Sequence, residues 1–230
     1  MDWDKSLLYD LKWCREIENL DEKTKLAKKV ASYVKDGDII GFGSGSTSFL
    51  AVNEIAKIVK EKKYKIKAIA TSQEIIFTCF SLGIDTCTIN EFKPDWGFDG
   101  ADEIDKNNWL IKGRGGAMLN EKLIMANSKI TYILCDKTKF VDRLCSKFSI
   151  PVECMFSSLN YVKQEFKKMG ASDIVLRQAK AKDGPVITEN GNFIIDVKFN
   201  DVKADLEQKI KCITGVIESG LFINYKIEIL

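Results

Sequence analysis

Residues 38–62 read DIIGFGSGSTSFLAVNEIAKIVKEK. The apolar run at residues 38–43 ends in glycines and has the length of a buried β-strand. Residues 46–62 are predicted to form the α-helix that follows. The Gly/Ser loop between them is therefore expected at the carboxyl end of a strand, where open α/β sheets bind their ligands.

Short apolar segments alternate with helical segments on both sides of this stretch. Helices are expected over residues 5–19, 21–35, 46–62, 73–83 and 121–128, and strands over residues 38–43, 66–72, 96–100 and 130–135. Such alternation favours an α/β fold, in which helices cover both faces of a mostly parallel β-sheet.

The pattern changes at Pro151. Beyond it, strands are expected over residues 151–155, 173–180 and 193–199, and helices over residues 159–170 and 202–212. Strands joined by a tight turn between two helices predict a small α+β lid domain of split βαβ type. We expect this lid domain to comprise residues 149–214 and the first domain to comprise residues 1–148 and 215–230. Residues 220–230 are expected as a strand that returns to the first sheet.

The composition excludes several classes of function. Charged residues make up 30% of the chain and the net charge is +2, which indicates no surface for nucleic acid or for an anionic membrane. There is no apolar run long enough to span a membrane, and the N-terminal residues do not resemble a signal peptide. The seven cysteines include no C-x-x-C pair, which favours a reducing cytoplasm.

The chain contains no histidine. Histidine is the side chain that most often transfers protons near neutral pH, and it is the commonest metal ligand. Any acid–base catalysis by this chain would therefore depend on carboxylates, lysines or tyrosines.

The Gly/Ser loop, GFGSGSTS at residues 41–48, is interpreted as an anion site. A helix N-terminus offers backbone N–H groups and a favourable dipole to an anion. Ser46 stands where a dinucleotide-binding loop needs its third glycine, and the lysine of a nucleoside triphosphate loop is missing. A phosphate monoester is therefore the better candidate ligand. The alternative is a plain Gly/Ser turn with a capping hydroxyl group.

The acidic segment DGADEID, residues 99–105, follows a predicted strand. Ala101 and Ile104 break the ligand spacing of a calcium-binding EF-hand loop. Asp99 and Asp102 could share a pocket, or they could belong to a solvated acidic turn.

The glycine-rich segment KGRGGAMLNEK, residues 112–122, carries Lys112 at one end and Glu121 near the start of a predicted helix. Neighbouring acids raise the pKa of a carboxyl group and a lysine lowers it, and such opposing effects suit a general base. Glu121 could instead serve only as a partner of the helix dipole. Lys139, just after the strand at 130–135, could join the site or lie on a solvated face.

Taken in order, the segments of this chain resemble ribose-5-phosphate isomerase of the A type; they are GFGSGST, TSQEI, DGADEID, KGRGGAMLNEK, KFVDRL, FSIPVEC, GPVITENGNFIIDVKF and GVIESGLF. The resemblance spans residues 39–222, and its most specific part is DGADEID together with K-G-x-G-G-A-x-x-x-E-K. It implies a Rossmann-like sheet flanked by helices, with a small split βαβ, ferredoxin-like domain. It also implies a cytoplasmic homodimer or tetramer that interconverts ribose 5-phosphate and ribulose 5-phosphate in the pentose phosphate pathway, without a metal or cofactor.

The resemblance implies a role for each matching residue. Glu121 stands at the position of the family's catalytic base, residues 99–102 at its sugar-binding acidic turn and residues 112–115 at its glycine-rich loop. From the needs of an aldose–ketose isomerisation, our hypothesis is that Lys112 stabilises the oxyanion, Asp99 assists ring opening and Asp102 holds hydroxyl groups. Substrate binding is implied for Ser44, Gly45, Ser46, Thr47, Gly100, Ala101, Gly113, Arg114, Gly115 and Lys139. Of these, residues 44–47 and Lys139 would bind the phosphate.

This chain departs from the family pattern at two positions and in one segment. Arg114 stands where the family usually has a small residue, and Asn120 where it commonly has arginine. Either the Arg114 side chain points to solvent, or the pocket is narrower than usual; we expect the first, because the rest of the motif is intact. The chain also begins with about one extra helix.

Other functions stay open at this point. Related folds serve sugar-phosphate deaminases, lactonases and CoA transferases, and a sensor could bind a sugar phosphate without turning it over. An NAD-dependent oxidoreductase is disfavoured by Ser46 and by the lack of an acidic residue after the strand at 66–72.

Overall fold

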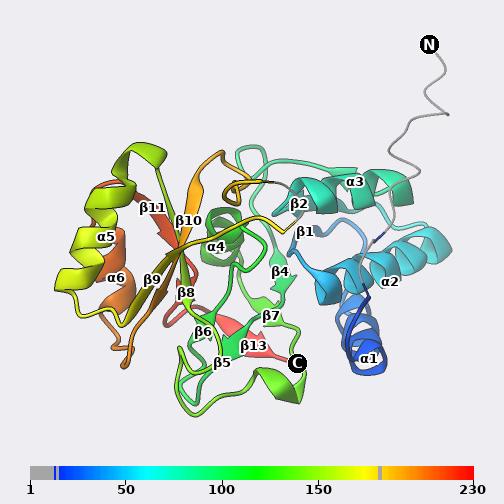
Figure 1. The fold of residues 1–230 in the computed structure, drawn as a ribbon. Helices are drawn as coiled ribbons and strands as arrows, with labels where there is room; N and C mark the ends of the chain where they lie inside the picture. Colours follow the sequence, from blue (N-terminus) through cyan, green and yellow to red (C-terminus); the bar gives the residue numbers. More distant parts are fainter. Residues whose placement is uncertain (1–12, 14–15, 181–182) are drawn as a thin grey trace. The chain divides into compact units, whose positions relative to one another are not determined.

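The computed structural model describes residue 13, residues 16–180 and residues 183–230 (Figure 1). The chain divides into two compact units, which are described one at a time. The first unit comprises Met1–Gly100, Leu123–Asp136 and Lys226–Leu230, and the second comprises Ala101–Lys122 and Lys137–Tyr225. Most of the helix expected over residues 5–19 lies outside the described residues, and residues 16–19 are not helical.

A six-stranded sheet forms the centre of the first unit. Its strand order is β13-β7-β4-β1-β2-β3, and every neighbouring pair is parallel. The strands are β1 (Ile39–Phe42), β2 (Lys67–Ala70), β3 (Asp85–Thr86), β4 (Trp96–Asp99), β7 (Thr131–Ile133) and β13 (Ile227–Ile229). The parallel α/β sheet expected from the sequence is therefore confirmed.

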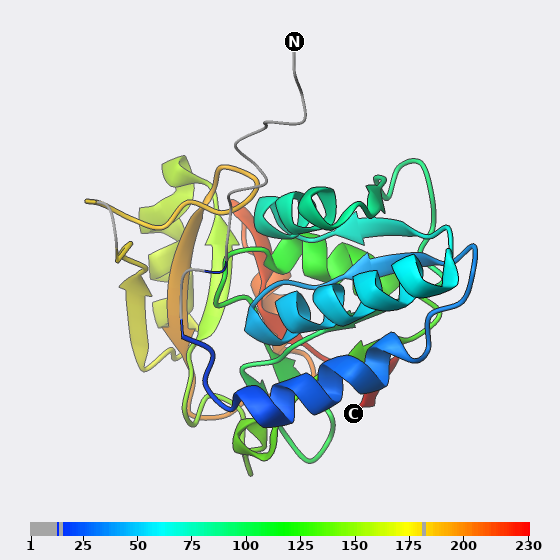
Figure 2. The ribbon, with the colours of Figure 1, turned by 90° about the vertical axis from the view of Figure 1, so that its right-hand side faces the viewer.

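Helices cover both faces of this sheet. They are α1 (Leu20–Ala31), α2 (Ser46–Lys62), α3 (Gln73–Leu82) and the part of α4 (Met118–Asn127) from residue 123 onward. Ile40 and Phe42 of β1 pack in one core cluster with Val30 of α1 and Ile55 of α2. Helices α1 and α2 lie side by side in Figure 2. Alternate residues of a strand point to opposite faces of the sheet. Gly41 therefore faces the other side, where Ile124 of α4 packs so closely that a Cβ on residue 41 would overlap it.

Sequence signals set the ends of these helices. Helix α2 covers residues 46–62 as expected, and it follows Gly45, whose φ of 85° lies in the left-handed region. Helix α3 begins after Ser72, whose hydroxyl oxygen accepts a hydrogen bond from Ile75 N, and it ends at Gly83 with φ 71°. Ser72 therefore serves as a helix cap.

A four-stranded antiparallel sheet belongs to the second unit. Along the chain run β8 (Ile150–Cys154), α5 (Leu159–Lys168), β9 (Asp173–Leu176), β10 (Phe193–Lys198), α6 (Leu206–Lys211) and β11 (Val216–Ser219). The spatial order is β11-β8-β10-β9, so two split βαβ halves interlock, as the sequence predicted. Their common core includes Val152, Phe166, Val197 and Ile210.

Strand β11 was not predicted from the sequence, and it belongs to the sheet of the second unit. Residues 215–230 were expected with the first domain, but β11 pairs with β8. The strand is four residues long, it lies between Gly215 and Gly220, and a register shift between Val216 and Glu218 interrupts its alternation. These features hide it from pattern analysis.

A small three-stranded antiparallel sheet was not expected at all. It has the order β12-β6-β5, with β5 (Glu103–Ile104), β6 (Leu110–Ile111) and β12 (Leu221–Phe222). Within residues 220–230, therefore, β12 joins this sheet and only β13 returns to the first one. The compact units also place residues 101–122 and 137–148 with the second unit, while the domain boundaries at 148/149 and 214/215 stay predictions.

No helix in the described part of the chain has the length and apolar character needed to cross a membrane.

Candidate active site

The Gly/Ser loop joins β1 to α2 in the first unit. Strand β1 ends at Phe42, and α2 begins at Ser46. The first N–H groups of a helix have no acceptor within the helix, so the start of α2 can donate to an anion. Ser44, Gly45, Ser46 and Thr47 are all partly exposed, so a ligand can reach them.

Gly43 brings this loop against Asp99 at the end of β4. Gly43 N donates to Phe98 O over 2.8 Å. A Cβ on Gly43 would overlap the Asp99 carboxyl group, so only glycine fits here. The Asp99 side chain is buried, and its Oδ1 accepts a hydrogen bond from Gly100 N over 2.7 Å. The predicted residues Asp99 and Gly100 thus lie beside the predicted anion loop.

Lys23 adds a cation to the same loop, and sequence reasoning missed it. It lies on α1, it is only 9% exposed, and its Nζ donates to Ser46 Oγ over 3.3 Å. A signal was present, because Lys23, Ala27 and Val30 share one face of the helix. A lysine on an apolar helix face is unusual unless it has a polar partner.

In the second unit, Lys112 and Glu121 form a buried ion pair. Lys112 Nζ lies 3.3 Å from Glu121 Oε2, and the side chains are 3% and 4% exposed. Glu121 belongs to the first turn of α4, and Lys112 follows β6 directly. Two predicted catalytic residues therefore meet where solvent hardly reaches their side chains.

The charge of Asp102 interacts with the charges of Lys112 and Glu121. Its N–H donates to Ile111 O over 2.8 Å, which holds the acidic turn beside the residue that precedes Lys112. Burial raises the pKa of Asp102 above its ordinary value, and the charge of Glu121 adds to this rise. Lys112, Lys139 and Arg114 oppose it. Asp102 is thus coupled to four of the predicted site residues.

Glu103 and Asp105, the other two acids within residues 101–105, each have structural partners. Glu103 is fully buried, and its Oε1 accepts hydrogen bonds from Lys147 N at 2.5 Å and Phe148 N at 2.7 Å. Asp105 Oδ1 accepts from Asn107 N and Trp109 N, each at 2.9 Å. Glu103 therefore holds the loop at residues 147–148, and Asp105 holds the turn that follows it.

The glycine-rich loop has the backbone that its composition predicts. Gly113 has φ 93° and Gly116 has φ 88°, both in the left-handed region that favours glycine. The Arg114 and Gly115 positions are exposed. Arg114 therefore does not fill a buried pocket, which agrees with the expectation that its side chain points to solvent.

Arg177 of β9 holds this loop, and the sequence did not point to it. Its Nη1 donates to Gly113 O over 3.1 Å and to Arg114 O over 2.8 Å. Its Nε donates to Asp196 Oδ2 over 2.8 Å, and Nη2 pairs with the other oxygen of that carboxylate. This fork arrangement fixes the guanidinium plane. It anchors the loop that begins at Lys112.

Lys139 is the last predicted site residue. It lies in a 3-10 helix, Lys137–Lys139, and is partly buried, with Nζ 5.9 Å from the centre of the Phe148 ring. Its position beyond β7 is the one predicted from the sequence. Ala101 is also partly buried, next to Asp102.

In the second unit, a buried lysine–carboxylate pair and an adjacent carboxyl group with a raised pKa suit proton transfer. In the first unit, the Gly/Ser loop at the start of α2 suits an anion. The family model for ribose 5-phosphate isomerase A (phosphoriboisomerase A) matches residues 67–230. The chain belongs to this family.

Relatives in the ribose 5-phosphate isomerase A family match most of the chain. The protein named ribose-5-phosphate isomerase A from Methanocaldococcus jannaschii is 40% identical over 208 residues, which cover 90% of this chain and 92% of the relative. Its namesake from Archaeoglobus fulgidus is 38% identical over 210 residues, with the same coverage.

Solved structures of the family have the same fold. The ribose 5-phosphate isomerase A structure from Methanocaldococcus jannaschii has a TM-score of 0.89 at 39% identity and covers 92% of this chain and 95% of that one. A D-ribose-5-phosphate isomerase in complex with phospho-erythronic acid has a TM-score of 0.88 at 33% identity, with 93% and 95% covered.

Proposed function

We propose that this protein interconverts D-ribose 5-phosphate and D-ribulose 5-phosphate through an enediolate, with Glu121 as the general base. The observation that carries the proposal is the buried ion pair between Lys112 and Glu121, with Nζ and Oε2 3.3 Å apart. Membership of the ribose 5-phosphate isomerase A family supports the choice of substrate.

Aldose–ketose isomerisation moves one proton between C2 and C1. Glu121 takes the proton from C2 of the open-chain aldose and returns it to C1, so that one carboxylate serves both steps. Negative charge develops on the substrate oxygens in between. The ammonium group of Lys112 stabilises this charge in a site that holds little water, where electrostatic interactions are strong.

The two aspartates act on the sugar hydroxyl groups. Asp99 assists opening of the furanose ring, which frees the carbonyl group for the proton transfer. Asp102 holds hydroxyl groups through hydrogen bonds. Because burial raises the pKa of Asp102, this carboxyl group takes up a proton more readily than an exposed aspartate does.

The phosphate group anchors the end of the substrate that does not react. Residues 44–47 supply backbone N–H and hydroxyl donors, and Lys23 and Lys139 supply positive charge. Binding energy at the phosphate holds C1 and C2 in the correct orientation at the base. Contacts with a non-reacting part of the substrate accelerate the reaction in this way.

The test is incubation of the purified protein with ribose 5-phosphate and EDTA, with ketose formation followed over time. Glu121→Gln is assayed alongside, and Glu165→Gln, which removes a partly exposed carboxylate on α5, is the matched control. Turnover by the wild type and the control, lost in Glu121→Gln, is the expected result. Binding of ribose 5-phosphate without turnover would favour a sensor, or a related sugar-phosphate deaminase or lactonase with another substrate.

Metal independence is part of the proposal, and the EDTA tests it. Among residues 13, 16–180 and 183–230, no three cysteine, aspartate or glutamate side chains gather as a metal site requires. Loss of turnover in EDTA, restored by a divalent cation, would contradict this part.

We also propose that the protein works in the cytoplasm as a homodimer or homotetramer. None of the six cysteines that the structure describes forms a disulfide, which suits a reducing compartment. The oligomeric state rests on the family resemblance. Size-exclusion chromatography with light scattering measures it, and a monomer at assay concentrations would contradict it.

A further inference from the structure

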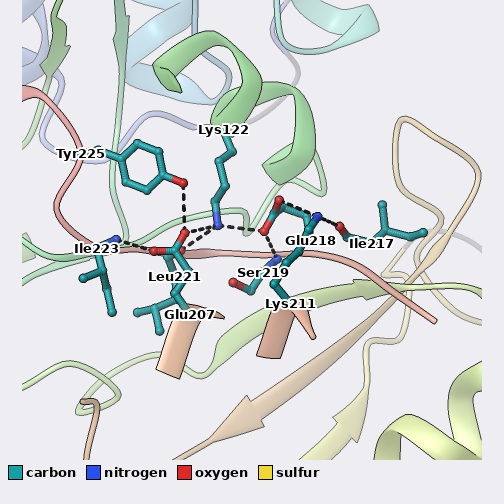
Figure 3. Close-up of polar contacts among 9 residues, drawn as sticks. All are labelled: Lys122, Glu207, Lys211, Ile217, Glu218, Ser219, Leu221, Ile223 and Tyr225. Carbon is teal, nitrogen blue, oxygen red and sulfur yellow. Dashed lines mark hydrogen bonds and ion pairs between the residues drawn. The ribbon is translucent and has the colours of Figure 1, made fainter. Parts of the chain in front are cut away.

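Lys122, the residue after Glu121, faces a separate set of partners. Its side chain is 8% exposed. Its Nζ lies 2.6 Å from Glu207 Oε1, 2.9 Å from Glu218 Oε1 and 2.9 Å from Leu221 O (Figure 3). An ammonium group has three protons to donate, so these acceptors satisfy it completely.

The acidic partners are themselves held in place. Lys211 Nζ lies 2.9 Å from Glu218 Oε2, and Tyr225 donates its hydroxyl proton to Glu207 Oε1 over 3.1 Å. Two backbone N–H groups also hold these carboxylates: Ile223 N donates to Glu207 Oε2 and Ser219 N donates to Glu218 Oε1, each over 2.9 Å. We call Lys122, Glu207, Lys211, Glu218 and Tyr225 the Lys122 cluster. Its lysines and glutamates balance in charge.

Residues 220–222 connect this cluster to Lys112. Lys112 N donates to Gly220 O over 2.8 Å, and a Cβ on Gly220 would overlap Lys112 O. Leu221 O accepts from Lys122, as described above. The Phe222 ring centre lies 4.7 Å from Lys122 Nζ and 5.7 Å from Lys112 Nζ, so both cations lie close enough to interact with one ring.

The same three residues therefore touch both sides of the Lys112–Glu121 pair. Gly220 O accepts from Lys112 N, and Leu221 O accepts from the side chain of Lys122 in α4. Strand β12 also pairs with β6, which leads into Lys112. These contacts run from the backbone of Lys112 to the residue next to Glu121, the two partners that lie 3.3 Å apart.

We propose that Lys122 is a positioning residue for the isomerase reaction, which fixes the Glu121 carboxylate relative to Lys112 through residues 218–222. This inference rests on the proposed function. Misplacement of a reacting group by about 1 Å can cost on the order of 10²-fold in rate. A buried ionic cluster adds little stability compared with apolar packing of similar size, so precise placement is the better explanation of why charges occupy this position.

The test compares Lys122→Met with Lys211→Met. Both remove one lysine from the cluster, but Lys211→Met leaves all three bonds of Lys122 intact. Each variant is assayed with ribose 5-phosphate and with substrate carrying deuterium at C2. Lys122→Met is expected to lower kcat by about 10- to 100-fold with little change in KM. Its isotope effect on kcat is expected to exceed that of the wild type, because proton transfer becomes slower than the other steps. Lys211→Met is expected to stay within about twofold of the wild type on the same scale.

The isotope effect separates positioning from folding, since it does not depend on how many molecules are folded. A normal kcat in Lys122→Met, or a lower kcat with the wild-type isotope effect, would overturn the inference. If Lys122→Met does not fold, Glu207→Gln takes its place, because it keeps the lysine and weakens one of its bonds. An unchanged kcat and isotope effect in that variant would overturn the inference equally. Absence of turnover by the wild type would instead overturn the proposed function, and this inference with it.

Discussion

Lys112 Nζ lies 3.3 Å from Glu121 Oε2, and the two side chains are only 3% and 4% exposed. Charged groups are seldom buried so deeply unless they are paired. The pair joins the residue after β6 to the first turn of α4. Its carboxylate can take up a proton, and its ammonium group can stabilise the negative charge of an enediolate.

Glu121→Gln should lower kcat by at least about 10²-fold with little change in KM, the lower range for loss of a general base. Glutamine keeps the size and the hydrogen-bonding capacity of the side chain but cannot accept the C2 proton. Steady-state kinetics on ribose 5-phosphate measure the effect. A kcat close to that of Glu165→Gln would remove Glu121 from the role of base.

Lys139→Ala should weaken substrate binding more than it slows turnover. Lys139 is proposed to meet the phosphate, which lies away from the reacting carbons. The measurement is KM together with the Kd for inorganic phosphate. Lys137→Ala, an exposed neighbour in the same 3-10 helix, is the matched control. An unchanged KM in Lys139→Ala would take this residue out of the phosphate site.

Lys23→Ala should raise KM by about tenfold or more, because hydrogen bonds to charged groups contribute roughly 1.5–3 kcal/mol. Lys23 bonds Ser46 at the start of α2, and it is buried. Lys28→Ala, on the exposed face of the same helix, should leave KM unchanged. Equal KM values in the two variants would show that Lys23 serves the fold alone.

Asp102→Asn should make the protein more stable at neutral pH while it lowers activity. Burial raises the folded-state pKa of Asp102, so its contribution to stability is fully present below its ordinary pKa. That contribution is lost as the pH rises through the raised value. Asparagine does not ionise. The Tm difference between variant and wild type should therefore grow from acidic to neutral pH, and a difference that does not change with pH would contradict this explanation.

Arg177→Lys should loosen the glycine-rich loop without unfolding the second unit. Lysine cannot form the fork that bonds Asp196 and two loop carbonyl groups at once. Backbone amides at residues 112–117 should exchange hydrogen faster, and kcat should fall. Arg143→Lys, which alters an exposed arginine bonded to Asn200 O, is the control. Wild-type exchange rates in Arg177→Lys would show that the loop does not depend on the fork.

Local patterns predicted the elements that carry strong signals of their own. Helix α2 covers the expected residues because a left-handed glycine, Gly45, precedes it and a long amphipathic run follows. Glu121 and Lys112 were found because they belong to one short motif. The three-stranded sheet was missed because each of its strands has two residues, too few for a period of two to be detected.

Residues that act across long stretches of chain were also missed. Arg177 meets its loop partners 63 and 64 residues away, and the Lys122 cluster joins positions 85 and 96 residues apart. No spacing rule connects such positions, because tertiary folding alone brings them together. Lys23 is the exception, since its place among apolar residues of α1 was visible in advance.

Strand β13 has a consequence for the order in which the protein is assembled. It pairs with β7 in the register Ile227 to Thr131. The ribosome therefore synthesises most of the second unit, residues 137–225, between these two strands of the first sheet. Until residues 227–229 emerge, one side of β7 has backbone groups without a strand partner, and exposed sheet edges can pair with other chains. Long separations of this kind also slow folding. We therefore expect the nascent chain to depend on chaperones most strongly while β7 waits for β13.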